Sequence, residues 1–251
     1  MHRVPEPEIM AGDNEAASYA SAAALGYLGN IDASFVAQFL RLGLTRGTVL
    51  DIGTGPGLIP LKILEHCPTL RFVVTDLSDA MLALARQNAA AHPCGAAVQI
   101  EKADAKRLPY ADASFDAVIS NSVLHHLSDP AAYLREIARV VKPDGVLLVR
   151  DIRRPAGWLL PLWWRWFGRH YRGQMLQSYK DSLRAAYTKT ELARLLAQSP
   201  LRAGTVFTWR LTHLGIARGC LPKGENSFAA NECIISPIPT DAPTTGAPTY
   251  P

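Results

Sequence analysis

The stretch VLDIGTGPG, from Val49 to Gly57, decides the fold of this chain. The apolar residues around Asp51 favour a buried parallel strand, and the residues after Gly57 favour a helix. A strand, a glycine turn and a helix form the first unit of an open α/β sheet, where nucleotide-like ligands bind. Glycine suits such a turn because it adopts positive φ and has no Cβ to keep a ligand from the backbone. The stretch therefore predicts an α/β fold with a ligand pocket.

The spacing of the glycines argues against a nicotinamide or flavin cofactor. That fingerprint is G-x-G-x-x-G/A, but counted from Gly53 its last position falls on Leu58. Asp51 precedes the first glycine, where a carboxylate can face a cationic ligand. Asp76 closes a second apolar run, at the spacing of an acid that binds ribose hydroxyls. No G-K-[ST] follows the turn, which excludes a P-loop.

Four motifs in order resemble the class I S-adenosylmethionine-dependent methyltransferases. VLDIGTGPG resembles the first motif of that family, and VVTDLS, from Val73 to Ser78, resembles the second. The stretch from Lys102 to Leu127 resembles the third and fourth, and RVVKPDGVLLVRD, from Arg139 to Asp151, resembles the entry to the fifth strand. The resemblance covers Thr48 to Asp151. Within the family the chain is loosely similar to the small-molecule branch, which includes quinone-ring methyltransferases.

The resemblance implies a Rossmann-like, doubly wound and mostly parallel α/β sheet of about seven strands, with an antiparallel last strand and helices on both faces. A helical lid insertion is expected after the fifth strand. We predict an amino-terminal helical cap (1–47), a cofactor-binding core (48–151), a Trp- and Arg-rich lid (152–187), a carboxyl-terminal helix with closing strands (188–235) and a disordered tail (236–251).

Local signals predict where several elements begin and end. Asp129 followed by proline predicts a helix start, and Thr188 with Glu191 predicts a capping box. The run from Lys142 to Gly145 predicts a turn, with the fifth strand starting at Val146.

The resemblance also implies S-adenosylmethionine as the cofactor and S-adenosylhomocysteine as its product. Asp51 is expected to bind the amino group of the cofactor, and Asp76 to accept hydrogen bonds from the ribose. Asp104 is expected to meet the adenine amino group; the alternative is that it caps a turn, and the four motifs in order favour the binding role. The cofactor-binding residues that we predict are Asp51, Gly53, Thr54, Gly55, Asp76, Leu77, Asp104, Ala105 and Asn121.

Candidate catalytic residues follow the fourth and fifth strands. His125 and His126 are candidates for a general base because histidine titrates near neutrality. The alternative is that both lie on a short helix and cap or pack. Asp151 is expected to touch the substrate or hold Arg153, and Tyr187 to reach the pocket or pack. No metal site is expected, because neighbouring side chains on a helix point apart.

The segment from Arg150 to Arg172, RDIRRPAGWLLPLWWRWFGRHYR, combines tryptophans with arginines. A helix from Pro161 onward would align its arginines on one stripe and leave aromatic side chains around the rest. A lid over an apolar substrate is the first interpretation. The others are a membrane-surface anchor from Trp158 to Tyr171 and a core or dimer-interface helix. Gly168 leaves room for a hinge.

Composition restricts the class of protein further. The chain has 251 residues, 48% of them hydrophobic, and a net charge of +4, which is too small to indicate nucleic acid by itself. No N/D-P-P-Y motif follows the fourth strand, which also argues against nucleic-acid methylation. The 4 cysteines form no C-x-x-C pair, so neither zinc nor a disulfide framework is indicated. The acidic, proline-containing start is not typical of a signal peptide, and no apolar run has the length of a membrane span.

From these features we expect a cytoplasmic monomer or homodimer, with contact to the inner membrane face as an alternative. The expected activity is methyl transfer to a small acceptor, apolar or a soft nucleophile, by direct displacement under a lid that excludes water. Alternative acceptors are a small thiol or sulfide and a membrane-associated quinone-like lipid. An alternative of another class is a protein that senses S-adenosylmethionine without transferring its methyl group.

Overall fold

The structure is a computed structural model that describes residues 3–6 and 27–219. Most of the predicted helical cap before residue 27 and the predicted tail, residues 236–251, therefore lie outside the described residues.

A seven-stranded sheet forms the centre of the described chain, in the order β3-β2-β1-β4-β5-β7-β6. β1 to β5 pair in parallel, and β7 is antiparallel to both β5 and β6. The predicted Rossmann-like sheet with an antiparallel last strand is thus confirmed. The strands are β1 (Gly47–Ile52), β2 (Leu70–Asp76), β3 (Val98–Lys102), β4 (Phe115–Asn121), β5 (Val141–Ile152), β6 (Thr205–Trp209) and β7 (His213–Arg218).

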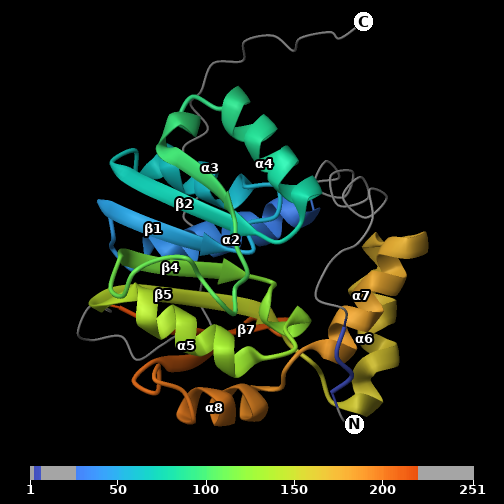
Figure 1. Ribbon diagram of the computed structural model, residues 1–251. Coiled ribbons are helices and arrows are strands. Elements are labelled where there is room, and N and C mark those ends of the chain that lie inside the picture. The colour runs from blue at the N-terminus through green and yellow to red at the C-terminus, as the bar shows by residue number, and fades with distance from the viewer. Residues whose placement is uncertain (1–2, 7–26, 220–251) are drawn as a thin grey trace, which may run out of the picture.

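Helices cover both faces of this sheet. Apolar side chains of α2 and α3 pack against one face, and those of α5 and α8 pack against the other. α6 and α7 stand together to one side of the sheet (Figure 1). The helices are α2 (Tyr27–Leu40), α3 (Leu58–His66), α4 (Asp79–Ala91), α5 (Pro130–Val140), α6 (Leu160–Trp166), α7 (Gly173–Ala185) and α8 (Lys189–Ala197), with short 3-10 helices η1 (Gly95–Ala97), η2 (Leu124–His126), η3 (Gly157–Leu159) and η4 (Gly168–His170).

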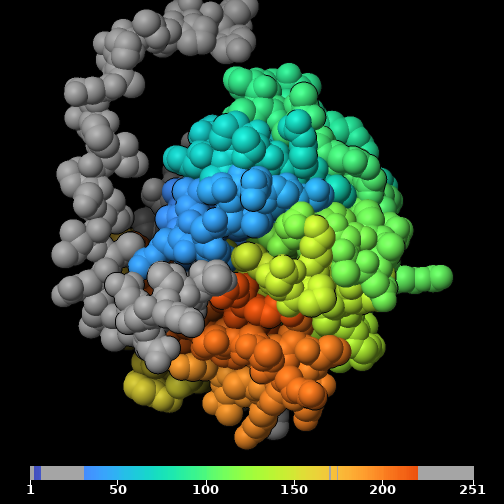
Figure 2. Space-filling view, turned by 90° about the vertical axis from the view of Figure 1, so that its left-hand side faces the viewer, coloured from blue at the N-terminus to red at the C-terminus, as the bar shows by residue number. Residues whose placement is uncertain are grey.

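The order of the strands reverses at β1, because the chain moves from β1 to β2 and β3 on one side and then returns to β4 on the other. Figure 2 shows the side of the molecule that faces away from α6 and α7. On this side the blue residues near the amino terminus lie between teal and green residues above and orange and red residues below. In open α/β sheets a ligand crevice forms beyond the carboxyl ends of the strands at such a reversal. The glycine turn follows β1 and lies at this point.

The predicted helix caps are present. The Asp129 side chain accepts from the Ala132 N–H at the start of α5. Thr188 and Glu191 form a reciprocal capping box at the start of α8. Each cap satisfies backbone N–H groups that the first helical turn leaves without a partner.

The predicted turn from Lys142 to Gly145 is wrong, since these residues lie within β5. Val141 pairs with Phe115 and Val146 with Ala117, so the intervening residues of β5 bulge beside β4. The ladder resumes on both sides of the bulge, and for this reason the strand continues through a sequence that favours a turn.

The predicted continuous helix from Pro161 is also wrong, because α6 ends at Trp166 and η4 follows. Gly168 is buried, and a Cβ added there would lie 3.0 Å from Cδ1 of Leu176 on α7. At the same contact the guanidinium of Arg184 on α7 lies over the ring of Trp164 on α6, with the guanidinium carbon 5.1 Å from the ring centroid. Close packing of the two helices therefore turns the chain at Gly168.

Candidate functional site

The glycine turn after β1 has the backbone that its sequence predicts. Gly53, Gly55 and Gly57 have φ of 69°, 55° and 74°, in the left-handed region that favours glycine. A Cβ on Gly53 would collide with Val123, and one on Gly57 would lie 3.2 Å from Cβ of Ala85. A Cβ on Gly55 would meet nothing within 4 Å. Gly53 and Gly57 thus serve packing, whereas Gly55 leaves open space beside the backbone.

Asp76 ties the end of β2 to this turn. Its Oδ2 accepts from the Gly55 N–H at 2.9 Å, and its Oδ1 accepts from the Ser78 N–H at 2.9 Å. Burial raises the pKa of Asp76, and these backbone N–H groups partly oppose the rise. The second-strand acid therefore holds the glycine turn in place and lies at the wall of the pocket.

Asp51 is an almost completely buried acid, 3% exposed, near the end of β1. Burial raises its pKa to about 7, Thr54 opposes the rise, and the nearby carboxylates of Asp76 and Asp32 add to it. The described residues thus place three acids near one another at the mouth of the turn, and their proximity opposes the ionisation of Asp51 in the free protein. A bound cation would favour its ionised form, because opposite charges stabilise each other strongly in a buried site.

A cavity of about 290 Å³ begins at this turn and extends to α7. Its walls contain every predicted cofactor-binding residue except Asp104. Oδ1 of Asp104 accepts from the Lys106 N–H at 2.9 Å and lies 3.0 Å from Lys106 Nζ, so this acid caps a turn. Oδ1 of Asn121 accepts from Nε of Arg150 at 2.9 Å, which fixes the direction of its amide. The predicted residues that line the cavity are Asp51, Gly53, Thr54, Gly55, Asp76, Leu77, Ala105 and Asn121.

The chemistry of this wall fits S-adenosylmethionine. Open space beside Gly55 admits a ligand to the backbone, and the buried Asp51 carboxyl suits an ammonium group. Leu77, Met81 and Ala105 supply apolar surface for a flat ring. The cavity therefore provides a polar and an apolar end for a ligand that has both.

His125 and Asp151 form a buried pair at the other end of the cavity. Nδ1 of the His125 ring lies 2.6 Å from Oδ1 of Asp151, and the backbone N–H of His125 donates to Oδ2 of Asp151 at 2.8 Å. Burial alone would raise the pKa of Asp151, but contact with His125 lowers it below its usual value. An ionised Asp151 accepts a proton-bearing Nδ1, which leaves Nε2 of His125 as an acceptor. His125 lines the cavity, whereas Asp151 does not.

Asp151 and Tyr187 lie differently from what the sequence predicts. Asp151 was expected to touch the substrate or hold Arg153, but its contacts are with His125 and the Ile152 N–H. Tyr187 is buried, pairs with Arg153 through the backbone, and does not line the cavity. Both residues thus lie outside the cavity wall, and Asp151 acts on the cavity through its contact with His125.

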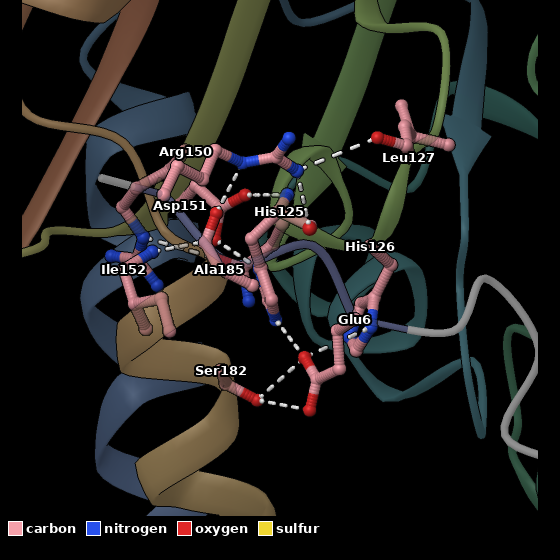
Figure 3. Close-up of polar contacts among 11 residues, drawn as sticks. Glu6, His125, His126, Leu127, Arg150, Asp151, Ile152, Ser182 and Ala185 are labelled. Atoms are coloured by element: carbon pink, nitrogen blue, oxygen red, sulfur yellow. Dashed lines mark hydrogen bonds and ion pairs between the residues drawn. The ribbon is translucent and has the colours of Figure 1, made fainter.

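The expectation that His125 and His126 point apart is wrong. Both lie on the short helix η2, but their ring centroids are 4.0 Å apart and both rings line the cavity. The carboxylate of Glu6 lies next to them, 3.4 Å from Nδ1 of His126 (Figure 3). A 3-10 helix of one turn does not follow the side-chain directions of a regular α-helix.

Much of the cavity wall comes from α7, which lies within the segment predicted as the lid, residues 152–187. Tyr171, Met175, Ser178, Tyr179 and Ser182 line the cavity opposite the glycine turn. Met175, Ser178 or Tyr179, and Ser182 follow one another at spacings of three or four residues, which indicates one face of a helix. That periodicity could have shown a shared face, but not which part of the sheet the face would cover.

No helix within residues 27–219 is both long and apolar enough to cross a membrane.

Comparison with known proteins relates the central part of the chain to methyltransferases. Residues 50–149 match the family model described as a methyltransferase domain. The demethylmenaquinone methyltransferase of Deinococcus radiodurans is 37% identical over 122 residues, which cover 49% of this chain and 50% of that protein. The chain thus spans about half the length of the curated relatives it matches.

Two solved structures show the same fold. A Methanococcus maripaludis protein assigned to the S-adenosyl-L-methionine-dependent methyltransferases has a TM-score of 0.64 and 18% identity, and the match covers 86% of this chain and 96% of that one. A SAM-dependent methyltransferase of Aquifex aeolicus has a TM-score of 0.55 and 20% identity, over 72% of this chain and 87% of that one. Residues 50–149 thus match a methyltransferase domain, and the described chain has the fold of solved S-adenosylmethionine-dependent methyltransferases.

Proposed function

We propose that this chain transfers a methyl group from S-adenosylmethionine to a small-molecule acceptor. The observation that carries the proposal is the single cavity that joins the glycine turn and Asp51 at one end to His125 and α7 at the other. A donor and an acceptor bound side by side in one cavity react as an intramolecular pair, which removes much of the entropic barrier.

The chain's own residues would hold the cofactor as follows. Asp51 binds the ammonium group, Asp76 meets the ribose, and Leu77 packs beside the adenine. Asn121, held by Arg150, orients the amino-acid end. Bound S-adenosylmethionine supplies an electrophilic methyl group on a positive sulfur. The predicted role of Asp104 at the adenine is not part of the proposal, because Lys106 already engages its carboxylate.

The acceptor would lie between His125 and α7. Leu127, Ile152, Met175 and Leu183 make this part of the wall apolar, which suits an apolar acceptor or a soft nucleophile. Nε2 of His125 receives the proton of an acceptor hydroxyl or thiol, while Asp151 keeps the ring in that tautomer. α7 covers the acceptor and excludes water.

The named relatives narrow the acceptor further. The Deinococcus radiodurans relative is a demethylmenaquinone methyltransferase, so we propose a quinol-like ring as the first acceptor class, with a small thiol as the second. In the non-catalytic alternative, a protein that senses S-adenosylmethionine, the cofactor would bind without any acceptor reacting.

The proposed activity is tested by following labelled methyl from S-adenosylmethionine into a panel of quinols, phenols and thiols. We expect transfer to at least one quinol or thiol. Binding of S-adenosylmethionine by calorimetry together with transfer to none of the panel would favour the sensor and count against an enzyme of this class.

A stripe of exposed apolar side chains supports the alternative of membrane contact. Trp158, Leu162 and Trp166 are 80%, 55% and 59% exposed, and their spacing of four residues sets them along one side of η3 and α6. Arg165 and Arg169 are exposed beside them. Tryptophan flanked by basic residues is typical of helices that lie in an anionic membrane surface. We propose that this stripe docks on such a surface, with the α7 wall of the cavity behind it.

Replacing both Trp158 and Trp166 by serine is expected to abolish flotation with vesicles that contain an anionic lipid. Each tryptophan removed from the interface costs about 1.5–3 kcal/mol of binding, so loss of the pair weakens binding more than hundredfold even at the lower end of that range. Leu211→Ser is the matched control, since Leu211 is 61% exposed but lies between β6 and β7. The wild type could instead fail to float and sediment as a dimer, with the double variant a monomer. That result would mean that the stripe docks on a second copy of the chain and not on a membrane.

A further inference from the structure

The amino-terminal segment from Arg3 to Glu6 lies against the acceptor end of the cavity. Arg3 donates from Nε to the carbonyl oxygen of Ala185 at 2.5 Å and from Nη2 to that of His125 at 2.9 Å. Its guanidinium carbon also lies 4.5 Å from the ring centroid of Tyr187. These contacts fasten the segment to α7 and η2, more than 100 residues away in the chain.

The anchored segment brings a carboxylate to the two histidines of η2. Oε2 of Glu6 lies 3.4 Å from Nδ1 of His126 and 3.8 Å from Nε2 of His125. The hydroxyl of Ser182 donates to the same carboxylate, 3.1 Å from Oε2. Figure 3 shows Glu6 pointing into the space between His125, His126 and Ser182. One oxygen and two imidazole nitrogens thus converge from separate parts of the fold.

The spacing of these three atoms fits one tetrahedral metal ion. Bonds of about 2.0–2.1 Å to Zn²⁺ place neighbouring ligand atoms about 3.3–3.4 Å apart. The two distances to Glu6 are 3.4 and 3.8 Å, and all three ligand atoms lie within 4.8 Å of one another. His126 is the more exposed histidine, at 16% of its side chain against 4% for His125, so its ring has room to turn toward an ion.

Asp151 orients His125 as an outer carboxylate orients a metal ligand. It binds Nδ1 at 2.6 Å, which directs the unprotonated Nε2 toward Glu6. Histidines that bind metal nearly always donate their other ring nitrogen to such a group, which fixes the ring and strengthens the ligand. The contact between Asp151 and His125 is separate from the three converging ligand atoms, and it also indicates that His125 binds a metal ion.

We propose that Glu6, His125 and His126 bind a divalent transition-metal ion, with Zn²⁺ as the best fit. Two imidazole nitrogens and one carboxylate oxygen suit Zn²⁺ or Co²⁺ and disfavour Mg²⁺ and Ca²⁺, which prefer oxygen ligands throughout. The fourth position of a tetrahedral ion faces the cavity, because both histidines and Ser182 line it. An oxygen or sulfur atom from water or from an acceptor would occupy that position.

Binding of the ion has a consequence for methyl transfer that rests on the proposed function. The ion occupies Nε2 of His125, which the proposed reaction uses to receive a proton. It also holds residues 3–6 on the cavity through Glu6. The metal-loaded protein is therefore the inactive form, and Zn²⁺ acts as an inhibitor at this site.

The metal site is tested on the full chain, without any acceptor, by titrating Zn²⁺ in competition with a chromophoric chelator. We expect one tightly bound ion per chain, and an affinity that falls by at least the 10–100-fold typical of outer-shell changes in Glu6→Gln and in His126→Gln. His66→Gln, an exposed histidine on α3, is the matched control and should bind as the wild type does. Mg²⁺ should not compete, and Co²⁺ should show the visible absorption of a tetrahedral site.

Equal Zn²⁺ affinity in the wild type and in a Glu6→Gln, His126→Gln double variant would overturn the site, provided that thermal unfolding shows the variant folded. In the activity assay, Zn²⁺ should inhibit the wild type at least tenfold more strongly than it inhibits Glu6→Gln. Tight binding of Zn²⁺ without inhibition of methyl transfer would overturn the proposal that the metal-loaded protein is inactive. Absence of methyl transfer from every preparation counts against the proposed function instead, and the Zn²⁺ titration still decides the metal site.

Discussion

Asp51→Asn is expected to weaken the binding of S-adenosylmethionine by roughly 30- to several thousand-fold. Loss of one partner from a buried charge pair costs about 2–5 kcal/mol. Asp51 is almost fully buried, and Asn keeps its shape but not its charge. Calorimetry of the wild type and the variant measures the difference. Asp79→Asn is the matched control, because that acid has a side chain 79% exposed at the start of α4 and does not line the cavity.

The same substitution is expected to change the pH dependence of cofactor binding. Burial raises the pKa of Asp51 in the free protein to about 7. The carboxylate form binds an ammonium group, so the wild-type affinity should rise as pH increases from about 6 to 8. Asp51→Asn removes this dependence over that range. An affinity for the wild type that is constant, or that falls between these pH values, would show that Asp51 does not bind the amino group.

His125→Gln is expected to lower kcat by about 10²–10⁴-fold, the usual contribution of a positioned general base. The cofactor affinity should stay within twofold, because His125 lies at the acceptor end of the cavity. The assay uses whichever acceptor the methyl-transfer screen identifies. Asp151→Asn should also lower kcat, since it removes the group that fixes the tautomer of the ring.

His66→Gln serves as the control for the His125 measurement, since this histidine is exposed on α3. Thermal unfolding of each variant separates a lost base from a damaged fold. A fall in kcat below threefold for His125→Gln would mean that the acceptor needs no base, as expected for a thiolate. Such a result would leave alignment by the cavity as the source of catalysis.

The cofactor half of the site follows from short stretches of sequence. The strand, the glycine turn and Asp51 lie within nine consecutive residues, Val49 to Gly57, and their roles depend on local backbone conformation. Asp76 required one further step, because parallel strands end at a common edge of the sheet. Asp104 is the predicted residue that does not line the cavity, and Nζ of Lys106 lies 3.0 Å from its carboxylate.

The acceptor half required contacts between distant segments. The tryptophan-rich stretch contains a helix pattern, but its packing against α7 ended the helix at Trp166. The bulge from Lys142 to Gly145 likewise depends on pairing with β4. A local preference for a turn stabilises the chain less than the hydrogen bonds between β4 and β5 that continue on both sides of these residues. Pairing between the strands therefore decided the conformation.

The sequence by itself predicted the α/β sheet, the glycine turn and S-adenosylmethionine as the methyl donor, because these predictions depend on residues close together in the chain. The tertiary structure decided that Glu6, His125 and Ser182 meet at the acceptor end. Arg3 holds its segment there through backbone carbonyls of η2 and α7, groups that every residue carries. No residue pattern marks such a partner, and for this reason the meeting of these side chains emerges from the packed fold alone.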